Sequence, residues 1–468
     1  MIFNAGLLII LTLSEYGKSL KSYEQDTSKV HFTSNANKSE TFLLFTDVHL
    51  DLMYKKTGDK SQFCRNKNTK SSHKADYGSL GRIGCDAPLN LLRSVLYAMK
   101  QKTKSPEFIL MPGDATPHHL GRKDRRKQVL KIIKKLWSEV NSVFPDIPYF
   151  PVIGNNDIPG DYIMPGENDT WYSDVLNIWK DGILCTNCNM KYQTTSLDQL
   201  RKTFSYGGYY KVSTSDGKMN LLVLNTMYWT KSAWKPKNYF VNRANTQMKW
   251  LEGQLNIARK TKKKVIISSH ISLGMDIYVH MSTWMSNFTD LYINLVVNEF
   301  NDVVAGQIFS HFHRDSFRLL SDKKKDSSHR KFSYVLLMPS VSPSYRNYPA
   351  FRIVNLDPSL QAITDYEQYY LNIDIKNPVW QLDYKFSTRY PPTGDDDKVI
   401  NGKRIKHLSD NLISQRDYSF FNSFISSRQV RHKPDSYSRS LFYCAITCIR
   451  KKEFDACRKK YPEDNFDK

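Results

Sequence analysis

Long apolar runs are scarce in this 468-residue sequence, and none after residue 40 is long enough to cross a bilayer, which takes about 20 apolar residues. The short run Ala5–Leu13 is followed by small and polar residues, as in a secretory signal. We therefore expect a signal peptide at 1–22, although no Lys or Arg precedes the run, and a buried N-terminal strand is the alternative. Residues 23–40 are polar and are expected to form a linker.

Acidic residues are the minority charge. The chain has 46 Asp and Glu against 68 Lys and Arg, a net charge of +22. This excess favours anionic partners such as polyphosphate, nucleotides or acidic lipid head groups. No predicted helix gathers it into one basic stripe, so nucleic acid, which only the net charge supports, is not expected as a partner. A hydrophobic content of 40% and an aromatic content of 13% exclude a disordered chain.

Cysteines number only seven, and they point to an oxidising compartment. Cys64 and Cys85 lie in a Gly, Ser and Lys-rich loop that needs a crosslink, so we expect a disulfide between them. Cys185 and Cys188 form a CTNC motif at a predicted helix end, where we also expect a disulfide. The sequence lacks a second CxxC or a paired His that would make this motif half of a zinc site. Three more cysteines lie near the C-terminus, and an odd total leaves at least one thiol unpaired in a monomer.

Three N-glycosylation sequons agree with a secretory route, at Asn37, Asn168 and Asn287. Together with the signal and the disulfides, they predict a secreted protein or one of a vacuolar or lysosomal lumen. We expect no transmembrane span beyond the N-terminal signal.

Short runs rich in Ile, Val, Leu and Phe recur from residue 40 onward and predict buried strands. The expected strands are Thr41–Thr46, Glu107–Met111, Tyr149–Ile153, Asn220–Asn225, Lys264–Ser268, Val303–Phe309, Tyr334–Met338, Phe351–Val354 and a return strand formed by Trp380–Tyr384 and Phe386. Helical patterns occur at Leu89–Lys102, Lys123–Val143, Asp169–Leu184 and Thr246–Lys262. This alternation predicts an α/β layered catalytic domain over 41–389. Helical patterns at Leu408–Arg428 and Ser436–Lys460 predict a small helical, cysteine-containing C-terminal subdomain over 390–468.

Five short polar motifs follow predicted strands, four of them directly and one a residue later. They are Asp47-Val48-His49, Gly113-Asp114, Gly154-Asn155-Asn156-Asp157, Ser269-His270 and His311-Phe312-His313. A D-x-H or H-x-H at a strand end is expected to point two side chains to one side. One such motif is weak support for a metal site, but five in order predict a dinuclear site. Oxygen and nitrogen donors of this kind suit Zn, Mn or Fe.

The residues around these motifs resemble the calcineurin-like metallophosphoesterases, and within them the acid sphingomyelinase-like phosphodiesterases and endopolyphosphatases. The resemblance covers about residues 40–375 and rests on TDVHLDLMY (46–54), GDATPHH (113–119), SHFHRDSF (310–317) and PSVSPSYRNYPAFRIV (339–354). It implies a β-sandwich flanked by helices, and a hydrolase that uses two divalent metal ions, Zn being favoured and Mn or Fe the alternatives.

The resemblance also implies the role of each ligand. Asp47, His49 and His313 would hold one ion, Asn155, His270 and His311 the other, and Asp114 would bridge them. The ions would make hydroxide from a shared water and hold the phosphate during attack. Ser310 stands where the family usually has Gly, which is expected to alter a turn and to supply no chemistry.

Two further residues decide which bond is cut. Asn156 stands where many members of the family have a His that protonates the leaving group, and Asn has no such proton. This favours phosphoanhydrides, whose leaving groups need little protonation, so polyphosphate or nucleotides are the expected substrates. His118 is the alternative proton donor, and with it phosphodiesters remain possible; a substrate-phosphate contact or a plain loop position is the competing interpretation of this residue.

Two other functions stay open at this stage. Sphingomyelin hydrolysis would need an aromatic cage for phosphocholine, and Tyr228, Trp229, Trp234 and Trp284 are the candidates. The other is a non-catalytic protein that binds polyanions, against which the complete ligand set argues.

Overall fold

The computed structural model describes residues 40–66, 78–121, 123–188, 195–233, 237–322, 330–392, 394, 398–414, 418–432 and 438–462. The predicted signal peptide, all but the last residue of the predicted linker, Asn37 and Trp234 lie outside these residues. Residues 39–468 form one compact unit. Within the described ranges, no helix combines the length and the apolar character needed to span a membrane.

The first of two large sheets has six strands in the order β14-β13-β12-β1-β2-β3. Its strands are β1 (Glu40–Leu44), β2 (Ile109–Met111), β3 (Tyr149–Pro151), β12 (Ala350–Asp357), β13 (Ala362–Leu371) and β14 (Trp380–Lys385). Strands β1, β2 and β3 run parallel, whereas β12 pairs antiparallel with β1 and continues into an antiparallel β12-β13-β14 meander. The carboxyl ends of the three parallel strands therefore meet at one edge.

The second sheet also has six strands, in the order β10-β11-β9-β6-β5-β4. Its strands are β4 (Tyr210–Ser213), β5 (Met219–Val223), β6 (Lys264–Ile271), β9 (Val304–Ser310), β10 (Ser316–Ser321) and β11 (Phe332–Leu337). Strands β5, β6, β9 and β11 are parallel, and β4 and β10 flank them as antiparallel edges. A small hairpin, β7 (Met275–Asp276) and β8 (Met281–Ser282), follows β6.

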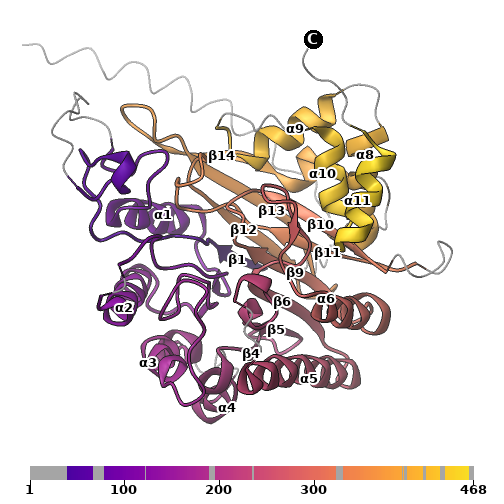
Figure 1. Cartoon of the computed structure of the whole chain (residues 1–468), viewed down its shortest axis with the longest axis horizontal. Helices are drawn as coiled ribbons and strands as arrows, with labels where there is room; N and C mark the ends of the chain where they lie inside the picture. The colour runs from indigo at the N-terminus through magenta and orange to yellow at the C-terminus, as the bar shows by residue number, and fades with distance from the viewer. Residues whose placement is uncertain are drawn as a thin grey trace, which may run out of the picture. The chain divides into compact units, whose positions relative to one another are not determined.

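The two sheets pack on each other in a sandwich, and helices cover their outer faces. Gly306 on β9 lies so close to Ile363 on β13 that a Cβ at Gly306 would be 2.9 Å from the isoleucine side chain. Figure 1 shows helices α1 to α4 along one side and α8 to α11 on the opposite side. The predicted α/β class and the sandwich flanked by helices are confirmed.

The first five α-helices are amphipathic. They are α1 (Leu89–Lys102), α2 (Arg125–Val143), α3 (Trp171–Leu184), α4 (Leu197–Gly207) and α5 (Asn238–Lys260). In α1 the buried residues recur every three or four positions, which gives one apolar face against the sheet. The sequence prediction missed α4, although Ser196 and Gln199 form a capping box at its start. It also began α5 eight residues too late, because Asn-rich residues precede the clear helical pattern.

The C-terminal helical region contains more and shorter helices than predicted. The region contains α8 (Gly402–Ser414), α9 (Ser419–Arg428), α10 (Arg439–Thr447) and α11 (Lys451–Lys460). Two further helices come earlier in the chain: α6 (Ser286–Ile293), which continues into a π-helical turn (Asn294–Glu299), and α7 (Phe386–Arg389). Phe386 begins α7, so its assignment to the return strand was wrong. Each of the two predicted C-terminal helices is a pair; the second breaks at Cys448, whose backbone is extended. Helices α8 and α10 pack on β10. The boundary at residue 390 between a catalytic domain and a C-terminal subdomain stays a prediction.

Candidate metal centre

The structure brings all seven predicted metal ligands together at the carboxyl ends of parallel strands, where α/β folds commonly place their sites. The loops after β1, β2 and β3 supply four of them from the first sheet, and β6 and the loop after β9 supply three from the second. These seven residues are Asp47, His49, Asp114, Asn155, His270, His311 and His313. All except His311 are buried, and His311 is half-buried.

The backbone of this site differs from the extended geometry that the sequence spacing suggested. Strand β1 ends at Leu44, and Asp47 and His49 lie beyond it with φ values of 47° and 46°. His311 and His313 likewise follow the end of β9, with φ values of 78° and 58°. The explanation by side-chain alternation along a strand was therefore wrong. Left-handed loop residues aim these side chains, a costly conformation for non-glycine residues that concentrates at functional sites.

Two positions in the predicted motifs require glycine for a steric reason. A Cβ at Gly113 would lie 2.6 Å from Nδ1 of His270, and one at Gly154 would lie 2.1 Å from Oδ1 of Asp114. Gly113 also has a φ of 99°. Only glycine allows these backbones to approach the ligand side chains so closely.

One group of ligands forms around Asp47 and His49. The Nε2 atoms of His49 and His313 lie 3.0 Å apart, and Oδ1 of Asp47 lies 3.3 Å from Nε2 of His313. Oδ2 of Asp114 is 3.5 Å from Nε2 of His49. Four donor atoms therefore converge on one small volume, as a metal ion requires.

A second group shares the Asp114 carboxylate. Nε2 of His270 lies 3.2 Å from Oδ2 of Asp114 and 3.1 Å from Oδ1 of Asn155. Nδ1 of His311 lies 3.3 Å from the same Nε2 atom. Two sets of three side chains lie close enough together to hold a metal ion. One set is Asp114, His270 and His311, and the other is Asp47, His49 and Asp114. Because Asp114 belongs to both groups, it is the residue placed to bridge two ions.

Backbone carbonyls fix the tautomers of two histidines. Nδ1 of His49 donates to the carbonyl of Thr116 at 2.9 Å, and Nδ1 of His270 donates to the carbonyl of Pro112 at 2.8 Å. Each ring therefore directs its Nε2 into the site. Burial lowers the pKa of His270, but Asp114 outweighs it and raises this pKa to about 9, so this ring would release a proton on binding a metal ion. The hydroxyl of Ser310 also donates to the Pro112 carbonyl and lies 2.9 Å from Nδ1 of His270. Ser310 thus contacts a ligand ring directly, a role that the sequence did not suggest.

The electrostatics of the site fit cations. Burial lowers the pKa of His49 to about 4 and that of His311 to about 3, so both rings are neutral and able to coordinate. Burial raises the pKa of Asp47 to about 7, and its Oδ1 has no hydrogen-bond partner among the described residues. Neutral imidazoles beside a buried, unpaired carboxylate oxygen are satisfied by metal ions, so the donor set fits two divalent cations.

Asn156 contacts the carboxylate of Asp114, the residue placed to bridge the two ions. Its backbone N–H donates to Oδ1 of Asp114, and its side-chain amide donates to Oδ2, both at 2.9 Å. Burial raises the pKa of Asp114, but the neighbouring His270 outweighs it and holds this pKa well below the usual range. Asp157 anchors the same loop by accepting hydrogen bonds from Thr116 and from the backbone of Gly154.

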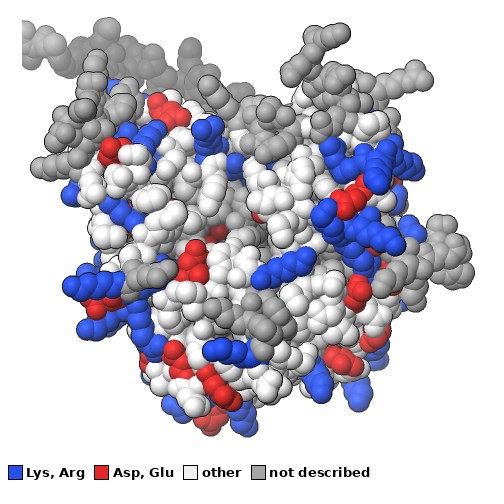
Figure 2. Space-filling view, in the orientation of Figure 1, with Lys and Arg blue, Asp and Glu red and all other residues white. Residues whose placement is uncertain are grey.

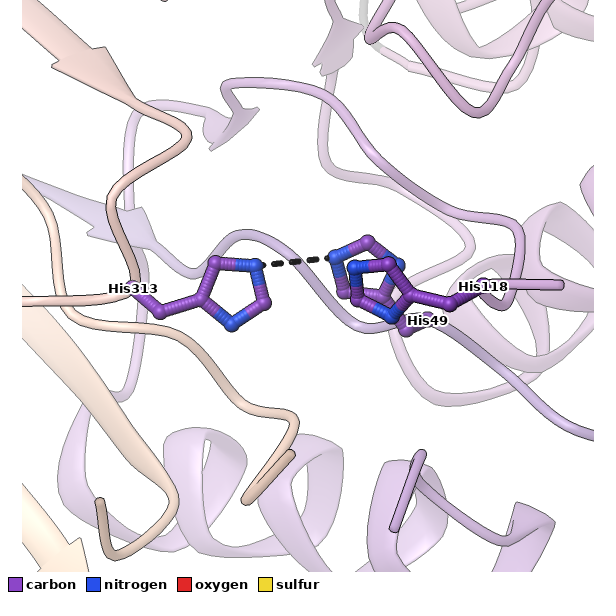
Figure 3. Close-up of side chains that lie close together, drawn as sticks. All are labelled: His49, His118 and His313. Atoms are coloured by element: carbon purple, nitrogen blue, oxygen red, sulfur yellow. Dashed lines mark hydrogen bonds between the residues drawn. The ribbon is translucent and has the colours of Figure 1, made fainter. Parts of the chain in front are cut away.

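His118 stands beside the first group of ligands. Its ring stacks on His49 with centroids 3.8 Å apart (Figure 3), and Nδ1 lies 2.9 Å from the buried carboxylate of Asp86. Asp86 also accepts from the backbone N–H of His118. Burial lowers the pKa of His118, but Asp86 outweighs it and raises this pKa above the ordinary value.

Sequence reasoning missed the residues that hold His118. Asp86 directly follows the disulfide-bonded Cys85, and a buried carboxylate there had no motif to mark it. Arg65 donates to the carbonyls of both His118 and His119 and pairs with Asp51 at 2.7 Å. His119 itself is exposed and stacks on Phe63, away from the ligands.

Disulfide bonds join Cys64 to Cys85 and Cys185 to Cys188, as expected, and a third joins Cys444 to Cys457. The first lies in the segment that carries Arg65, so it supports the position of His118. Cys448 is buried and takes no part in these three disulfides; its Sγ lies 3.7 Å from the hydroxyl of Thr447. The sequon residues Asn168 and Asn287 are exposed.

Three of the four residues predicted for a phosphocholine cage do not form one. Tyr228, Trp229 and Trp284 are fully buried in the core, and the indole rings of the two tryptophans pack 5.1 Å apart. Three of the four proposed cage residues are therefore core residues. Two tyrosines do border the site: Tyr345, which is 52% exposed and meets the His313 ring edge-on at 4.6 Å, and Tyr162, whose hydroxyl lies 3.3 Å from Nε2 of His311.

Comparison with known proteins gives the family. No protein-family model matches the chain. It is 30% identical over 366 residues to human acid sphingomyelinase-like phosphodiesterase 3b, covering 75% of each chain. It is 29% identical over 354 residues to bovine cyclic GMP-AMP phosphodiesterase SMPDL3A, covering 74% of each chain. It is also 29% identical over 364 residues to sphingomyelinase phosphodiesterase C of Dictyostelium discoideum, covering 74% of this chain and 77% of that one.

Solved structures resemble the chain only distantly. A dimetal phosphatase from Danio rerio has 11% sequence identity and a TM-score of 0.40, and covers 74% of this chain. The sequence relatives therefore carry the assignment. The fold and the site define a metal-dependent phosphoester hydrolase. The chain belongs to the acid sphingomyelinase-like phosphodiesterase family, which confirms the resemblance seen in its motifs.

Proposed function

We propose that the chain hydrolyses phosphodiester or phosphoanhydride bonds of nucleotides, with His118 as the acid that protonates the leaving group. The observation that carries this proposal is the position of His118. It stacks on His49 at the metal centre while its Nδ1 is held by Asp86. A histidine fixed in this way has its Nε2–H available for a leaving oxygen.

Two divalent ions would occupy the ligand groups described above. Asp47, His49 and His313 would hold one ion, Asn155, His270 and His311 the other, and Asp114 would bridge them. When bound, such a pair supplies a hydroxide nucleophile and neutralises charge on the phosphate oxygens. Zn suits this mixed oxygen and imidazole set best, and Mn and Fe remain alternatives.

The protein residues supply orientation and the proton. Thr116 and Pro112 carbonyls hold two histidine rings in the coordinating tautomer, and Asn156 holds both oxygens of Asp114. Asp86 raises the pKa of His118, which keeps its ring protonated to a higher pH. An acidic lumen suits such a donor, and the disulfides agree with a secretory or lysosomal location.

Nucleotides are favoured over lipid as substrate for two reasons. The half-exposed ring of Tyr345 lies beside His118 and His313, where a base could stack. Tyr228, Trp229 and Trp284, the described residues that were candidates for a phosphocholine cage, are buried in the core. Relatives include both a cyclic GMP-AMP phosphodiesterase and a sphingomyelinase phosphodiesterase, so lipid stays the second candidate.

Polyphosphate is supported by the net charge and by Asn156, which cannot protonate a leaving group. Figure 2 shows Lys and Arg in several separate groups on this face, the largest over the C-terminal helices. The exposed lysines Lys451, Lys452, Lys459 and Lys460 of α11 contribute to the basic surface. Dispersed charge of this kind favours polyanions in general and selects none.

A substrate panel tests the proposal. Full-length protein loaded with Zn or Mn would be assayed on a cyclic dinucleotide, ATP, polyphosphate and sphingomyelin vesicles between pH 4 and 8. We expect the highest kcat/KM on a nucleotide. A higher value on sphingomyelin would contradict the nucleotide assignment. No turnover of any substrate by protein that retains metal would indicate a polyanion-binding protein instead.

A further inference from the structure

Two of the proposed ligands of the second ion can bind a metal in only one of two orientations. The side chain of Asn155 ends in an oxygen and a nitrogen, and only the oxygen coordinates. The ring of His311 has two nitrogens, and the one that coordinates must be unprotonated. Oδ1 of Asn155 lies 3.1 Å and Nδ1 of His311 lies 3.3 Å from Nε2 of His270. Both side chains are therefore turned with one particular end toward the centre.

Asp161 and Tyr162 contact the opposite ends of these two side chains. Oδ1 of Asp161 accepts a hydrogen bond from Nδ2 of Asn155 at 3.1 Å, and the hydroxyl of Tyr162 lies 3.3 Å from Nε2 of His311. A carboxylate accepts hydrogen bonds and donates none, so it pairs only with the NH₂ end of Asn155. The oxygen of Tyr162 can accept the proton of Nε2, which leaves Nδ1 of His311 free to coordinate.

A tight turn places these two consecutive residues beside the ligands. The backbone N–H of Ile163 donates to the carbonyl of Gly160 at 2.8 Å, and Asp161 and Tyr162 form the bend between them. A Cβ at Gly160 would lie 2.9 Å from Cβ of Ile163, so the turn closes this tightly only with glycine there. Tyr162 has a left-handed φ of 54°, a costly conformation that is commonly retained where it serves a site.

The second metal position, the one that Asn155, His270 and His311 would form, has the weaker set of charges. Asp47 and Asp114 both offer carboxylates to the first position, whereas Asp114 is the one carboxylate among the proposed ligands of the second. Asn155 is neutral, and a histidine coordinates in its neutral form. The affinity of the second position therefore depends more on how well its neutral ligands are oriented.

We propose that Asp161 and Tyr162 are positioning residues that set the affinity of the second metal position. They act through Asn155 and His311, and the inference rests on the dinuclear centre of the proposed function. Removing such supporting contacts typically weakens metal binding about 10–100-fold. The hydrogen bonds of Asp161 and Tyr162 go to ligands of the second position, so the first position should keep its affinity.

A manganese titration separates the two positions. Metal-free full-length protein would be titrated with Mn²⁺ by calorimetry, which gives one Kd for each position. Electron paramagnetic resonance would distinguish an isolated Mn²⁺ ion from a coupled pair. In Asp161→Ala and in Tyr162→Phe we expect the second Kd to rise about 10–100-fold, with the first Kd unchanged. The coupled signal should then need more Mn²⁺ than in the wild-type chain.

Both variants are expected to fold, because Asp161 is exposed and Tyr162→Phe removes only a hydroxyl. Asp161→Asn is the conservative variant: its amide oxygen can still accept from Nδ2 of Asn155, so it should bind the second ion more tightly than Asp161→Ala. Asp198→Ala and Tyr97→Phe are the matched controls, because both residues are exposed, on α4 and α1. Both controls should keep the wild-type Kd at each position.

Two results would overturn the inference while the dinuclear centre stands. One is an unchanged second Kd in Asp161→Ala and Tyr162→Phe. The other is an equal rise of both Kd values, which would mean that the turn supports the fold in general. A wild-type chain that binds a single Mn²⁺ ion would instead refute the dinuclear centre itself, so the two failures are distinguishable without any assay of hydrolysis.

Discussion

The side-chain amide of Asn156 donates to Oδ2 of Asp114 at 2.9 Å, while the backbone N–H of the same residue donates to Oδ1 at 2.9 Å. One residue thus holds both oxygens of the carboxylate that is placed between the two ligand groups. Asn156 cannot protonate a leaving group, which is how the sequence first drew attention to it. The structure adds a contribution, because a fixed bridging carboxylate keeps the two ion positions in register.

Replacing Asn156 by Ala should weaken metal binding. Loss of the amide frees Oδ2 of Asp114, and removal of such supporting contacts typically costs about 10–100-fold in metal affinity or activity. Competition with a fluorescent chelator would measure the affinity. Asn301→Ala is the matched control, since Asn301 donates to Phe332 far from the ligands. Unchanged metal affinity in Asn156→Ala would show that this hydrogen bond does not support the centre.

Loss of His118 should depend on the leaving group. We expect His118→Ala to slow a nucleotide phosphodiester with an alkoxide leaving group by about 10²–10⁴-fold, the usual contribution of a general acid. Bis-p-nitrophenyl phosphate and polyphosphate, whose leaving groups need little protonation, should lose far less. His119→Ala serves as the control, because His119 is exposed and stacks on Phe63. Equal losses on all substrates would exclude His118 as the acid.

The pH profile should report the Asp86–His118 pair. A general acid works in its protonated form, so turnover of the nucleotide ester falls as pH rises through the pKa of His118. Asp86 raises that pKa, and Asp86→Asn should lower it, which moves the falling limb to lower pH. The same substitution in a His118→Ala background should move nothing. If the falling part of the pH profile did not move in Asp86→Asn, Asp86 would have no part in the acid function of His118.

The ion pair between Arg352 and Asp315 should contribute strongly to stability. Nη2 of Arg352 lies 2.5 Å from Oδ1 of Asp315, and both side chains are buried. Arg352→Met leaves the Asp315 charge without its partner, which should reduce the free energy of unfolding by about 3–5 kcal/mol. Urea denaturation would measure the loss, and Arg352→Met with Asp315→Leu should recover part of it.

An exposed ion pair gives the matched control for this experiment. Arg259 pairs with Asp302 at the surface at 2.6 Å. Arg259→Met should cost less than about 1 kcal/mol, because solvent screens such pairs. If Arg352→Met were equally mild, the buried pair would be irrelevant to stability.

The convergence of the proposed ligands was predictable in part, because the motifs that carry them follow apolar runs, four directly and one a residue later. Parallel pairing brings Asp47 close to Asp114 in the first sheet and His270 close to His311 in the second, and packing of the two sheets brings the two pairs together. The local backbone was not predictable. Side-chain alternation described an extended chain, whereas His49 and His313 adopt left-handed φ values that depend on tertiary contacts.

Residues that support the site but lie far from its motifs in the sequence could not be predicted either. Asp86 and Arg65 contact His118 only after the Cys64–Cys85 segment folds against the strand ends. The burial of Trp229 and Trp284 could not be predicted either, because a sequence does not show whether an aromatic residue lines a ligand site or packs in the core. The C-terminal helices were detected, but the break between α10 and α11 was not, because Cys448 and Ile449 are buried apolar residues that continue the helical pattern.

Metal content tests the central claim most directly. Full-length protein would be equilibrated by dialysis with trace divalent metals, and its metal content would be measured by mass spectrometry. We expect two divalent ions per wild-type chain. The Asp114→Asn variant is expected to lose both ions and the hydrolytic activity. A wild-type chain with a single ion, or an Asp114→Asn variant that keeps two ions and full activity, would contradict the dinuclear centre.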